Sequence, residues 1–282
     1  MARFSGKVAI VTGSSNGIGR ATGVLLASEG AKVTITGRHA QRLEESRQAV
    51  LAAGVPEANV NAVVADITTP EGQDLLISST LQKFGRIDIL VNNAGANIPD
   101  AQGRKATNGG IEQFQKMLQL NVQSVIEMTQ KIRPHLARTR GEIVNVSSIG
   151  AGPAAQAQNP YYSCAKAAMD QYSRSAAIDL ISEGIRINIV QPGFVSTGFS
   201  TAARGLSAEE SVQFYNTMGA HSYCIPAGYC GQPEHLAKVI AFLADRNSSE
   251  YIVGQTIIAD GGSSLVLGFH AHNAKVAQTA NN

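Results

Sequence analysis

The sequence has few charged residues and no cluster of one sign. Only 16% of its 282 residues are charged, the formal net charge is +2, and the basic residues are scattered without a run of lysine or arginine. A chain without a run of basic residues lacks the concentrated positive charge that attracts nucleic acid or an anionic membrane surface. We therefore expect neither of these partners, and a small-molecule ligand instead.

Cysteine is scarce, and long hydrophobic runs are missing near the N-terminus. The three cysteines, Cys164, Cys224 and Cys230, lack the C-x-x-C spacing of metal or redox sites, which is typical of proteins in a reducing compartment. The first apolar run ends at Gly13, too early for a secretory signal or a membrane span. These features predict a cytoplasmic protein with free thiols.

Two kinds of catalytic centre also lack their usual residues. Of the six histidines only His270 and His272 are close in sequence, and no carboxylate accompanies them, so no metal site is expected. Ser148 is not enclosed in the G-x-S-x-G turn of α/β-type hydrolases, which disfavours a hydrolase acting through this serine.

What the chain does contain is a regular alternation of short β-branched runs and longer amphipathic segments. Continuous apolar strands separated by helices predict a parallel sheet that is covered on both faces and built by right-handed crossovers. No linker or repeat divides the chain. We predict a Rossmann-type, doubly wound α/β fold with a seven-stranded parallel sheet in a single domain over residues 1–269. The expected strands are 7–12, 32–36, 60–64, 87–92, 141–147, 186–191 and 255–259, and the expected helices are near 17–29, 39–53, 71–84, 111–138, 160–183 and 233–244.

Two segments depart from this alternation. Residues 194–231 are rich in Gly, Ser and Ala and too long for an ordinary connection, so we predict a substrate lid within the domain. Its aromatic residues and the small residues 150–155 suggest a roomy apolar pocket for a cyclic or aryl ketone; alternatively, the aromatics only pack on the domain. Residues 270–282 are polar and without periodicity, and we expect a loose C-terminal tail.

The stretch "TGSSNGIG", Thr12 to Gly19, directly follows the first expected strand and opens the first helix. Glycines at this position allow a tight turn and close approach of the backbone to a pyrophosphate, which the helix N-terminus attracts. The turn therefore predicts a dinucleotide site. Its candidate residues are Gly13, Ser15, Asn16, Gly17, Ile18 and Gly19.

The end of the second strand indicates which dinucleotide is bound. An acid at this place accepts from the ribose 2′-OH of NAD, whereas a basic residue accommodates the 2′-phosphate of NADP. Gly37 occupies the expected acidic position and Arg38 follows it. NADP(H) is favoured, with a solvated surface arginine as the alternative.

The stretch "NPYYSCAK", Asn159 to Lys166, contains a Tyr-x-x-x-Lys spacing within an expected helix. Residues i and i+4 share a helical face, so Tyr162 lies beside Lys166, whereas Tyr161 does not. A neighbouring cation favours a phenolate, whose ordinary pKa near 10 is high for a base at neutral pH. Tyr162 is thus the better candidate for a proton donor and acceptor.

Further motifs lie at the expected carboxyl ends of strands: "NNAG" at 92–95, "NVSS" at 145–148 and "QPGFVST" at 191–197. Together with the phosphate turn and "YSCAK", they resemble the short-chain dehydrogenase/reductase family from Lys7 to the "DGG" at 260–262. Within the family the chain is most similar to carbonyl reductases of the tropinone-reductase-like kind.

The resemblance implies the catalytic residues Asn121, Ser148, Tyr162 and Lys166. Tyr162 would exchange a proton with the carbonyl oxygen, and Lys166 and the oxidised nicotinamide would lower its pKa. Ser148 would hydrogen-bond that oxygen, although it precedes Tyr162 by one residue more than is usual in the family, and Ser147 remains the alternative. Asn121 would free a helix carbonyl that holds a water next to Lys166.

The resemblance also completes the cofactor site. Asp66 would bond the adenine amino group, with Ile67 beside it, and the segment after strand four would approach the adenine ribose. The segment after strand six would hold the carboxamide, while Tyr162 and Lys166 would contact the nicotinamide ribose. The residues carried over in this way are Asp66, Ile67, Asn93, Ala94, Gly95, Pro192, Gly193, Val195 and Thr197.

These features predict an NADPH-dependent carbonyl reductase that works reversibly as an alcohol dehydrogenase on a small-molecule ketone or secondary alcohol. The alternative is a catalytically silent NADP(H)-binding sensor or scaffold on the same fold. Members of the family are commonly oligomers through the segments 111–138 and 160–183, so the resemblance implies a homotetramer or dimer.

Overall fold

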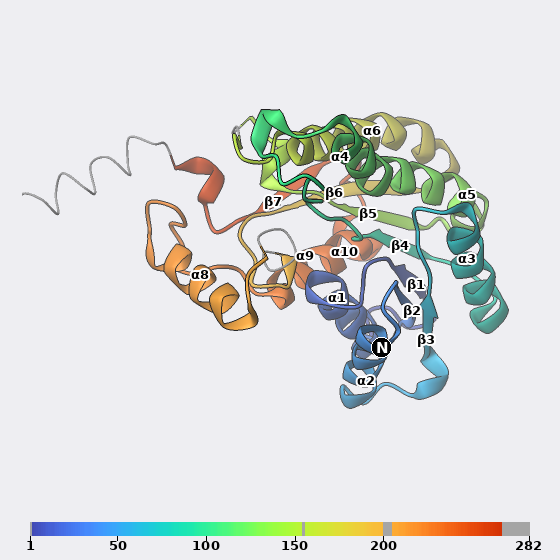
Figure 1. The fold of residues 1–282 in the computed structure, drawn as a ribbon. Coiled ribbons are helices and arrows are strands. Elements are labelled where there is room, and N and C mark those ends of the chain that lie inside the picture. Colours follow the sequence, from blue (N-terminus) through green and yellow to red (C-terminus); the bar gives the residue numbers. More distant parts are fainter. Residues whose placement is uncertain (1, 154–155, 200–204, 267–282) are drawn as a thin grey trace, which may run out of the picture.

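The computed structural model describes residues 2–153, 156–199 and 205–266, which form a seven-stranded parallel sheet (Figure 1). The strand order is β3-β2-β1-β4-β5-β6-β7, so the direction of winding reverses between β1 and β4. Ligands of open α/β sheets bind at such a reversal, beyond the carboxyl ends of the strands. The strands are β1 (Val8–Val11), β2 (Lys32–Gly37), β3 (Val60–Val64), β4 (Ile89–Asn92), β5 (Glu142–Val146), β6 (Arg186–Pro192) and β7 (Thr256–Ala259).

Helices cover both faces of the sheet. One face packs against α1 (Gly17–Ser28), α2 (Ala40–Ala52) and α9 (Pro233–Ala244), and the other against α3 (Pro70–Phe84), α5 (Ser124–Thr139) and α6 (Pro160–Leu180). The shorter helices are α4 (Ile111–Leu118), α8 (Ala208–Ala220) and α10 (Arg246–Ser249), and a π-helical turn, η3 (Gln119–Gln123), joins α4 to α5. The predicted doubly wound fold is confirmed.

The burial of the central strands explains why continuous apolar runs in the sequence predicted the sheet. Every residue of β1, β4, β5 and β6 is buried, as expected for parallel strands with helices on both sides. The core consists of two clusters, one on each face, centred on side chains such as Leu26 and Ile240 on one side and Met128 and Ile132 on the other.

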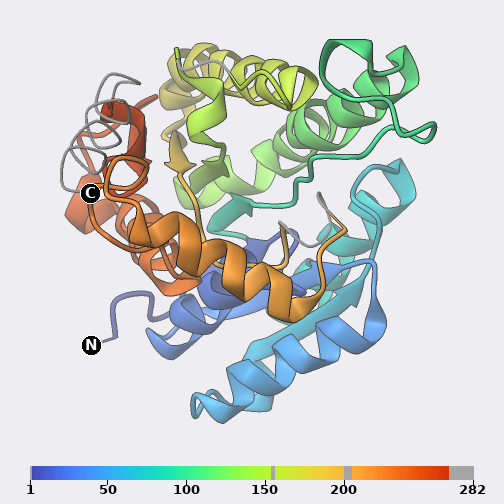
Figure 2. The same ribbon diagram turned by 60° about the vertical axis from the view of Figure 1, so that its left-hand side comes forward.

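Three elements differ from the sequence prediction. The single helix expected over 111–138 is broken by the π-helical turn around Asn121, and α10 was not foreseen. Segment 194–231 contains a regular helix, α8, which lies to one side in Figure 1 and comes forward in Figure 2. A capping box between Ser207 and Glu210 starts this helix, a signal that the residues do carry. The predicted tail, 270–282, lies outside the described residues.

A buried ion pair lies at the amino ends of β5 and β6, far from the reversal edge. Glu142 contacts Arg186 at 2.8 Å and Arg246 at 2.7 Å, and the Arg186 side chain is fully buried. Arg186 also donates to the carbonyl oxygens of Leu243, Ser249 and Ile252. The pair therefore ties β5 and β6 to the segment after α9.

None of the helices in the described ranges is long and apolar enough to cross a membrane.

Candidate active site

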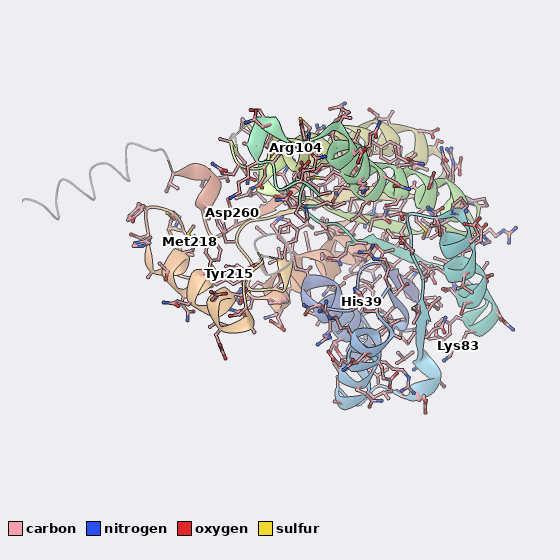
Figure 3. The ribbon with its side chains drawn as sticks, viewed as in Figure 1. His39, Lys83, Arg104, Tyr215, Met218 and Asp260 are labelled. Carbon is pink, nitrogen blue, oxygen red and sulfur yellow. The ribbon has the colours of Figure 1, made fainter. Side chains whose placement is uncertain are left out.

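The carboxyl ends of the strands open into a cavity of about 960 Å³. Its walls come from the turn after β1, the end of β2, the segments after β3, β4 and β5, the start of α6, and segment 194–231. Figure 3 shows three lining residues from distant parts of the chain: His39 before α2, Arg104 after β4 and Tyr215 on α8. The predicted site residues that line the cavity are Gly13, Ser15, Asn16, Gly17, Ile18, Arg38, Asp66, Ile67, Asn93, Ala94, Gly95, Ser148, Tyr162, Lys166, Pro192, Gly193, Val195 and Thr197. Gly19 and Asn121 are buried behind it.

The turn after β1 is shaped by close backbone contacts. Gly13 has a φ of +62°, and a Cβ there would lie 2.6 Å from the Cα of Ala94. The Asn93 amide donates to the carbonyl oxygens of Thr12 at 2.9 Å and Gly13 at 3.0 Å, and a Cβ on Gly19 would lie 2.4 Å from its nitrogen. These contacts require glycine and leave the start of α1 open to the cavity, as a bound pyrophosphate requires.

The end of β2 presents a crowded glycine followed by an exposed arginine. A Cβ on Gly37 would lie 2.9 Å from the Cβ of Ser15, so an acidic side chain there would force the turn to move. Arg38 is exposed, and its Nη1 lies 3.9 Å from Asp66 Oδ2. The other oxygen of Asp66 accepts from the backbone and hydroxyl of Thr68, which fixes the carboxylate. His39 and Arg42 line the same region.

Tyr162 is buried at the cavity wall, and its ring centroid lies 5.7 Å from that of Phe199. Burial raises the pKa of the Tyr162 phenol well above its ordinary value, a hydrogen bond with Ser148 partly opposes the rise, and the charge of Asp170 adds to it. For the polypeptide by itself, the direction is thus the reverse of the expected lowering.

Lys166 lies one turn after Tyr162 on the same buried face of α6. Its Nζ donates to the carbonyl oxygen of Val146 at 2.9 Å and lies 5.9 Å from the centre of the Tyr162 ring. Burial lowers the pKa of Lys166 to about 8, and the negative charge of Asp170 acts to raise it. A lysine held in this way titrates close to physiological pH.

The two adjacent serines at the end of β5 face different neighbours. Both serines line the cavity, but only Ser148 acts on Tyr162, where it lowers the pKa of the phenol, and its Oγ accepts from the backbone of Gly150 at 3.1 Å. Ser147 is buried, and its hydroxyl lies towards Asp170. The extra residue before Tyr162 therefore does not keep Ser148 away from it, because the chain first turns through the short 3-10 helix η4 (Ile149–Ala151).

Asn121 lies in the middle of the π-helical turn. Its side-chain nitrogen donates to the carbonyl oxygens of Ala96 and Met117, both at 3.0 Å, and its oxygen accepts from the backbone of Ala96 at 3.3 Å. A Cβ on Gly95 would lie 2.8 Å from this oxygen and 3.1 Å from Lys166 Nζ. Asn121 thus ties the segment after β4 to the helix wall directly behind Lys166. π-helical turns are frequent at functional sites.

Asp170 is a residue of the site that the sequence motifs did not predict. It is buried one turn after Lys166, and its Oδ2 accepts from the Gln191 amide at 2.6 Å. Burial raises the pKa of Asp170, while Ser147, Gln191 and Lys166 act to lower it. The signal was present in the sequence, since Tyr162, Lys166 and Asp170 follow one another at intervals of four and share one helical face.

The rest of the cavity is lined by aromatic, aliphatic and amide residues. Segment 194–231 contributes Phe194, Phe199 and Tyr215, but its other large side chains, Phe214, Met218 and Tyr223, do not line the cavity. Phe214 and Met218 instead pack with Ile225 and Cys230 inside the segment. The remaining wall contains the amide residues Asn97, Gln113, Gln156, Gln158 and Asn159 together with apolar residues such as Ile98, Met117 and Ile149. The wall is thus mixed, with apolar residues beside the amides, and an apolar pocket for a cyclic or aryl ketone stays a prediction.

Within the described part of the chain no group of three or more His, Cys, Asp or Glu side chains is arranged to hold a metal ion.

Comparison with known proteins gives consistent matches along the whole domain. A family model described as enoyl-(acyl carrier protein) reductase matches residues 13–264. A 3-oxoacyl-[acyl-carrier-protein] reductase from Synechocystis sp. is 35% identical over 263 residues, which cover 93% of this chain and 98% of the relative.

Two crystal structures from Caenorhabditis elegans are also similar. One is a short-chain dehydrogenase/reductase of unknown function with a cofactor, which is 61% identical with a TM-score of 0.94 and matches over 96% of this chain and 99% of its own. The other is a glucose dehydrogenase in the apo form, which is 56% identical with a TM-score of 0.80 over 94% of this chain and 100% of its own.

Proposed function

Because the chain belongs to the short-chain dehydrogenase/reductase family, we propose that it is an NADPH-dependent carbonyl reductase that also works in reverse as an alcohol dehydrogenase. Family membership makes it an NAD(P)(H)-dependent oxidoreductase that acts on CH–OH or C=O groups of small molecules. The preference for NADPH and for ketones is the proposed part, and so are the roles of the individual residues.

One observation carries the catalytic proposal. A buried phenol, Tyr162, lies at the cavity wall together with Ser148, and the Nζ of Lys166 lies 5.9 Å from the centre of its ring. A silent binding protein does not need a proton donor, a hydrogen-bonding serine and a cation together at one wall. This combination therefore favours catalysis over the sensor or scaffold alternative.

The residues perform complementary steps. A bound nicotinamide dinucleotide supplies the two-electron chemistry at its ring. In reduction, Tyr162 gives its phenolic proton to the substrate oxygen as that oxygen gains negative charge, and Ser148 stabilises the charge with a hydrogen bond. In oxidation Tyr162 takes the proton back, a step that the positive charge of Lys166 favours. Asn121 holds the backbone behind Lys166 in place.

NADPH is the proposed cofactor because the end of β2 leaves no room for an acid at Gly37 and presents Arg38 instead. A guanidinium binds a 2′-phosphate with two parallel hydrogen bonds. Asp66, Ile67 and residues 93–95 would hold the adenosine half, and Pro192, Gly193, Val195 and Thr197 the nicotinamide half. Segment 194–231 would close over the substrate as a lid.

We further propose a cytoplasmic homo-oligomer. Cys164, Cys224 and Cys230 are free thiols, as in proteins of a reducing compartment. On α6, Ile178 is 77% exposed, which supports contact between copies of the chain through the long helices. Light scattering coupled to gel filtration gives the mass of the assembly, and a monomer would contradict this part.

The central test is NADPH oxidation by the full chain against ketones, diketones, steroids and sugars, with NADH in parallel. We expect turnover with at least one carbonyl compound and a higher kcat/KM with NADPH. Tight NADPH binding without turnover of any compound would instead favour the sensor or scaffold.

A further inference from the structure

Four side-chain amides line the cavity from the segment after β4 and from the segment that leads into α6, the helix of Tyr162. Asn97 follows β4, and Gln156, Gln158 and Asn159 lie between η4 and α6; all four line the cavity, and we call them the amide wall. Each amide offers an acceptor oxygen and a two-hydrogen donor. The wall therefore presents many hydrogen-bonding groups to whatever occupies the cavity.

Among the described residues, most of these groups have no hydrogen-bond partner. The Asn97 amide donates to Asn159 Oδ1 at 2.7 Å, which leaves the Asn97 oxygen and the Asn159 nitrogen available. Among the residues that the structure describes, no hydrogen bond engages the amides of Gln156 and Gln158. By contrast, the nearby charged residue Arg104 is already paired with Asp100 at 3.0 Å.

Gln156 lies close to the reacting position. A Cβ on Gly150 would be 3.1 Å from the carbon and nitrogen of the Gln156 amide, so this amide rests against the Gly150 backbone. The same backbone donates to Ser148 Oγ. A substrate oxygen bonded to Ser148 therefore places the neighbouring atoms of the substrate within reach of Gln156.

The same cavity offers an apolar surface on its lid side. Phe194, Phe199 and Tyr215 line it, and the Phe199 ring, 39% exposed, lies against Tyr162. A ligand that satisfies both surfaces has a ring with hydroxyl groups at its edge and C–H groups on its face. An unsubstituted hydrocarbon ring would displace water from the amides without replacing those hydrogen bonds, which leaves buried polar groups unpaired and weakens binding.

We infer that the substrate is a polyhydroxylated ring compound whose reacting carbon is a cyclic hemiacetal or secondary alcohol. The inference rests on the proposed function and adds the substrate class. In oxidation with NADP⁺, the ring carbon loses its hydrogen with two electrons as hydride to the oxidised dinucleotide, the O–H proton passes to the ionised phenolate of Tyr162, and a C=O bond forms. A hexopyranose would give the lactone by this route.

The test compares rings that differ only in their hydroxyl groups, using the full chain and NADP⁺. A hexopyranose and tetrahydropyran-2-ol share the reacting hemiacetal, and inositol and cyclohexanol share the secondary alcohol. We expect kcat/KM to be about a hundredfold or more higher for the hydroxylated member of at least one pair, as for sites built to bond substrate hydroxyls. Equal or faster turnover of the plain ring in both pairs would overturn the inference but leave the oxidoreductase function standing.

Two variants test whether the amide wall causes the predicted preference for hydroxylated rings. Gln156→Leu and Asn97→Leu should raise KM for the hydroxylated substrate at least tenfold, with little change for the plain ring. Gln171→Leu, which alters an amide on the outer face of α6, is the matched control and should change neither. Unchanged KM in both wall variants would overturn the inference.

A binding measurement separates this inference from the proposed function. Ring binding to the NADPH complex is followed by saturation-transfer NMR, which does not depend on turnover. If nothing is turned over, the proposed function fails, and preferential binding of the hydroxylated rings still supports the amide wall. If the plain rings bind as well as the hydroxylated ones, the inference is overturned.

Discussion

Lys166 and Asp170 lie one helical turn apart on the buried face of α6, and each acts on the pKa of the other. Burial lowers the pKa of Lys166 to about 8, against the attraction of Asp170. Burial raises the pKa of Asp170, against the attraction of Lys166. Asp170 also raises the pKa of Tyr162, so one carboxylate acts on both titrating groups of the proposed catalytic centre.

Asp170→Asn should therefore shift the pH profile of activity to lower pH. Removing the negative charge lowers the pKa of Tyr162 and of Lys166 together, so both limbs of the kcat/KM profile move in the same direction, by about one unit. The measurement is kcat/KM for alcohol oxidation as a function of pH. Asp179→Asn, which removes an exposed carboxylate of the same helix, is the control and should leave the profile in place. An unshifted profile for Asp170→Asn would show that this carboxyl is uncharged in the working enzyme.

Tyr162→Phe should lower kcat by about a hundredfold or more, because general acid catalysis contributes at least that much. The ring stays in place, so NADPH should bind as before, which equilibrium titration of the dinucleotide fluorescence checks. Tyr161→Phe is the matched control. It removes only a 2.7 Å hydrogen bond to the Gly109 carbonyl oxygen and should cost about 1 kcal/mol of stability while keeping kcat within the same order. Comparable losses of kcat in both variants would remove Tyr162 from its role.

Arg38→Ala should weaken NADPH binding roughly tenfold to a hundredfold and leave NADH binding nearly unchanged, because only NADPH carries the 2′-phosphate. Dissociation constants for both dinucleotides test this directly. Arg47→Ala provides the control, since Arg47 is an arginine of α2 engaged with Glu44 and Glu57. An equal loss for both dinucleotides would show that Arg38 does not select between them.

Glu142→Gln should destabilise the fold by roughly 3–5 kcal/mol, because it leaves the buried Arg186 guanidinium without its counter-ion. Urea unfolding measures the change in the free energy of unfolding. Glu183→Gln removes a carboxylate from an exposed pair with Arg133 and should cost less than about 1 kcal/mol. Similar losses in the two variants would mean that burial of the Glu142 pair has no energetic consequence.

Much of the fold could be predicted from the sequence, since its signals are local. Continuous apolar runs such as Val8–Val11 give buried parallel strands, and amphipathic spacing gives the helices between them. The π-helical turn at Asn121 was not foreseen, because the side chain satisfies the carbonyl of Ala96, a partner that only the folded chain brings near. The helix α8 was not predicted, because its segment is rich in Gly, Ser and Ala. Ser207 and Glu210 nevertheless form a capping box that marks the start of this helix.

By itself, the sequence determined the alternation of strands and helices, the glycine turn at Gly13 and the shared helical face of Tyr162 and Lys166, because each depends on residues within a few positions of one another. Only the tertiary structure decided that Ser148 rather than Ser147 faces Tyr162, that Asp170 lies behind Lys166 against Gln191, and that amides as well as aromatics line the cavity. These contacts join strands and helices that crossover connections bring together from distant parts of the chain. These contacts form only once the core has packed, and only then does burial shift the pKa values of Lys166 and Tyr162.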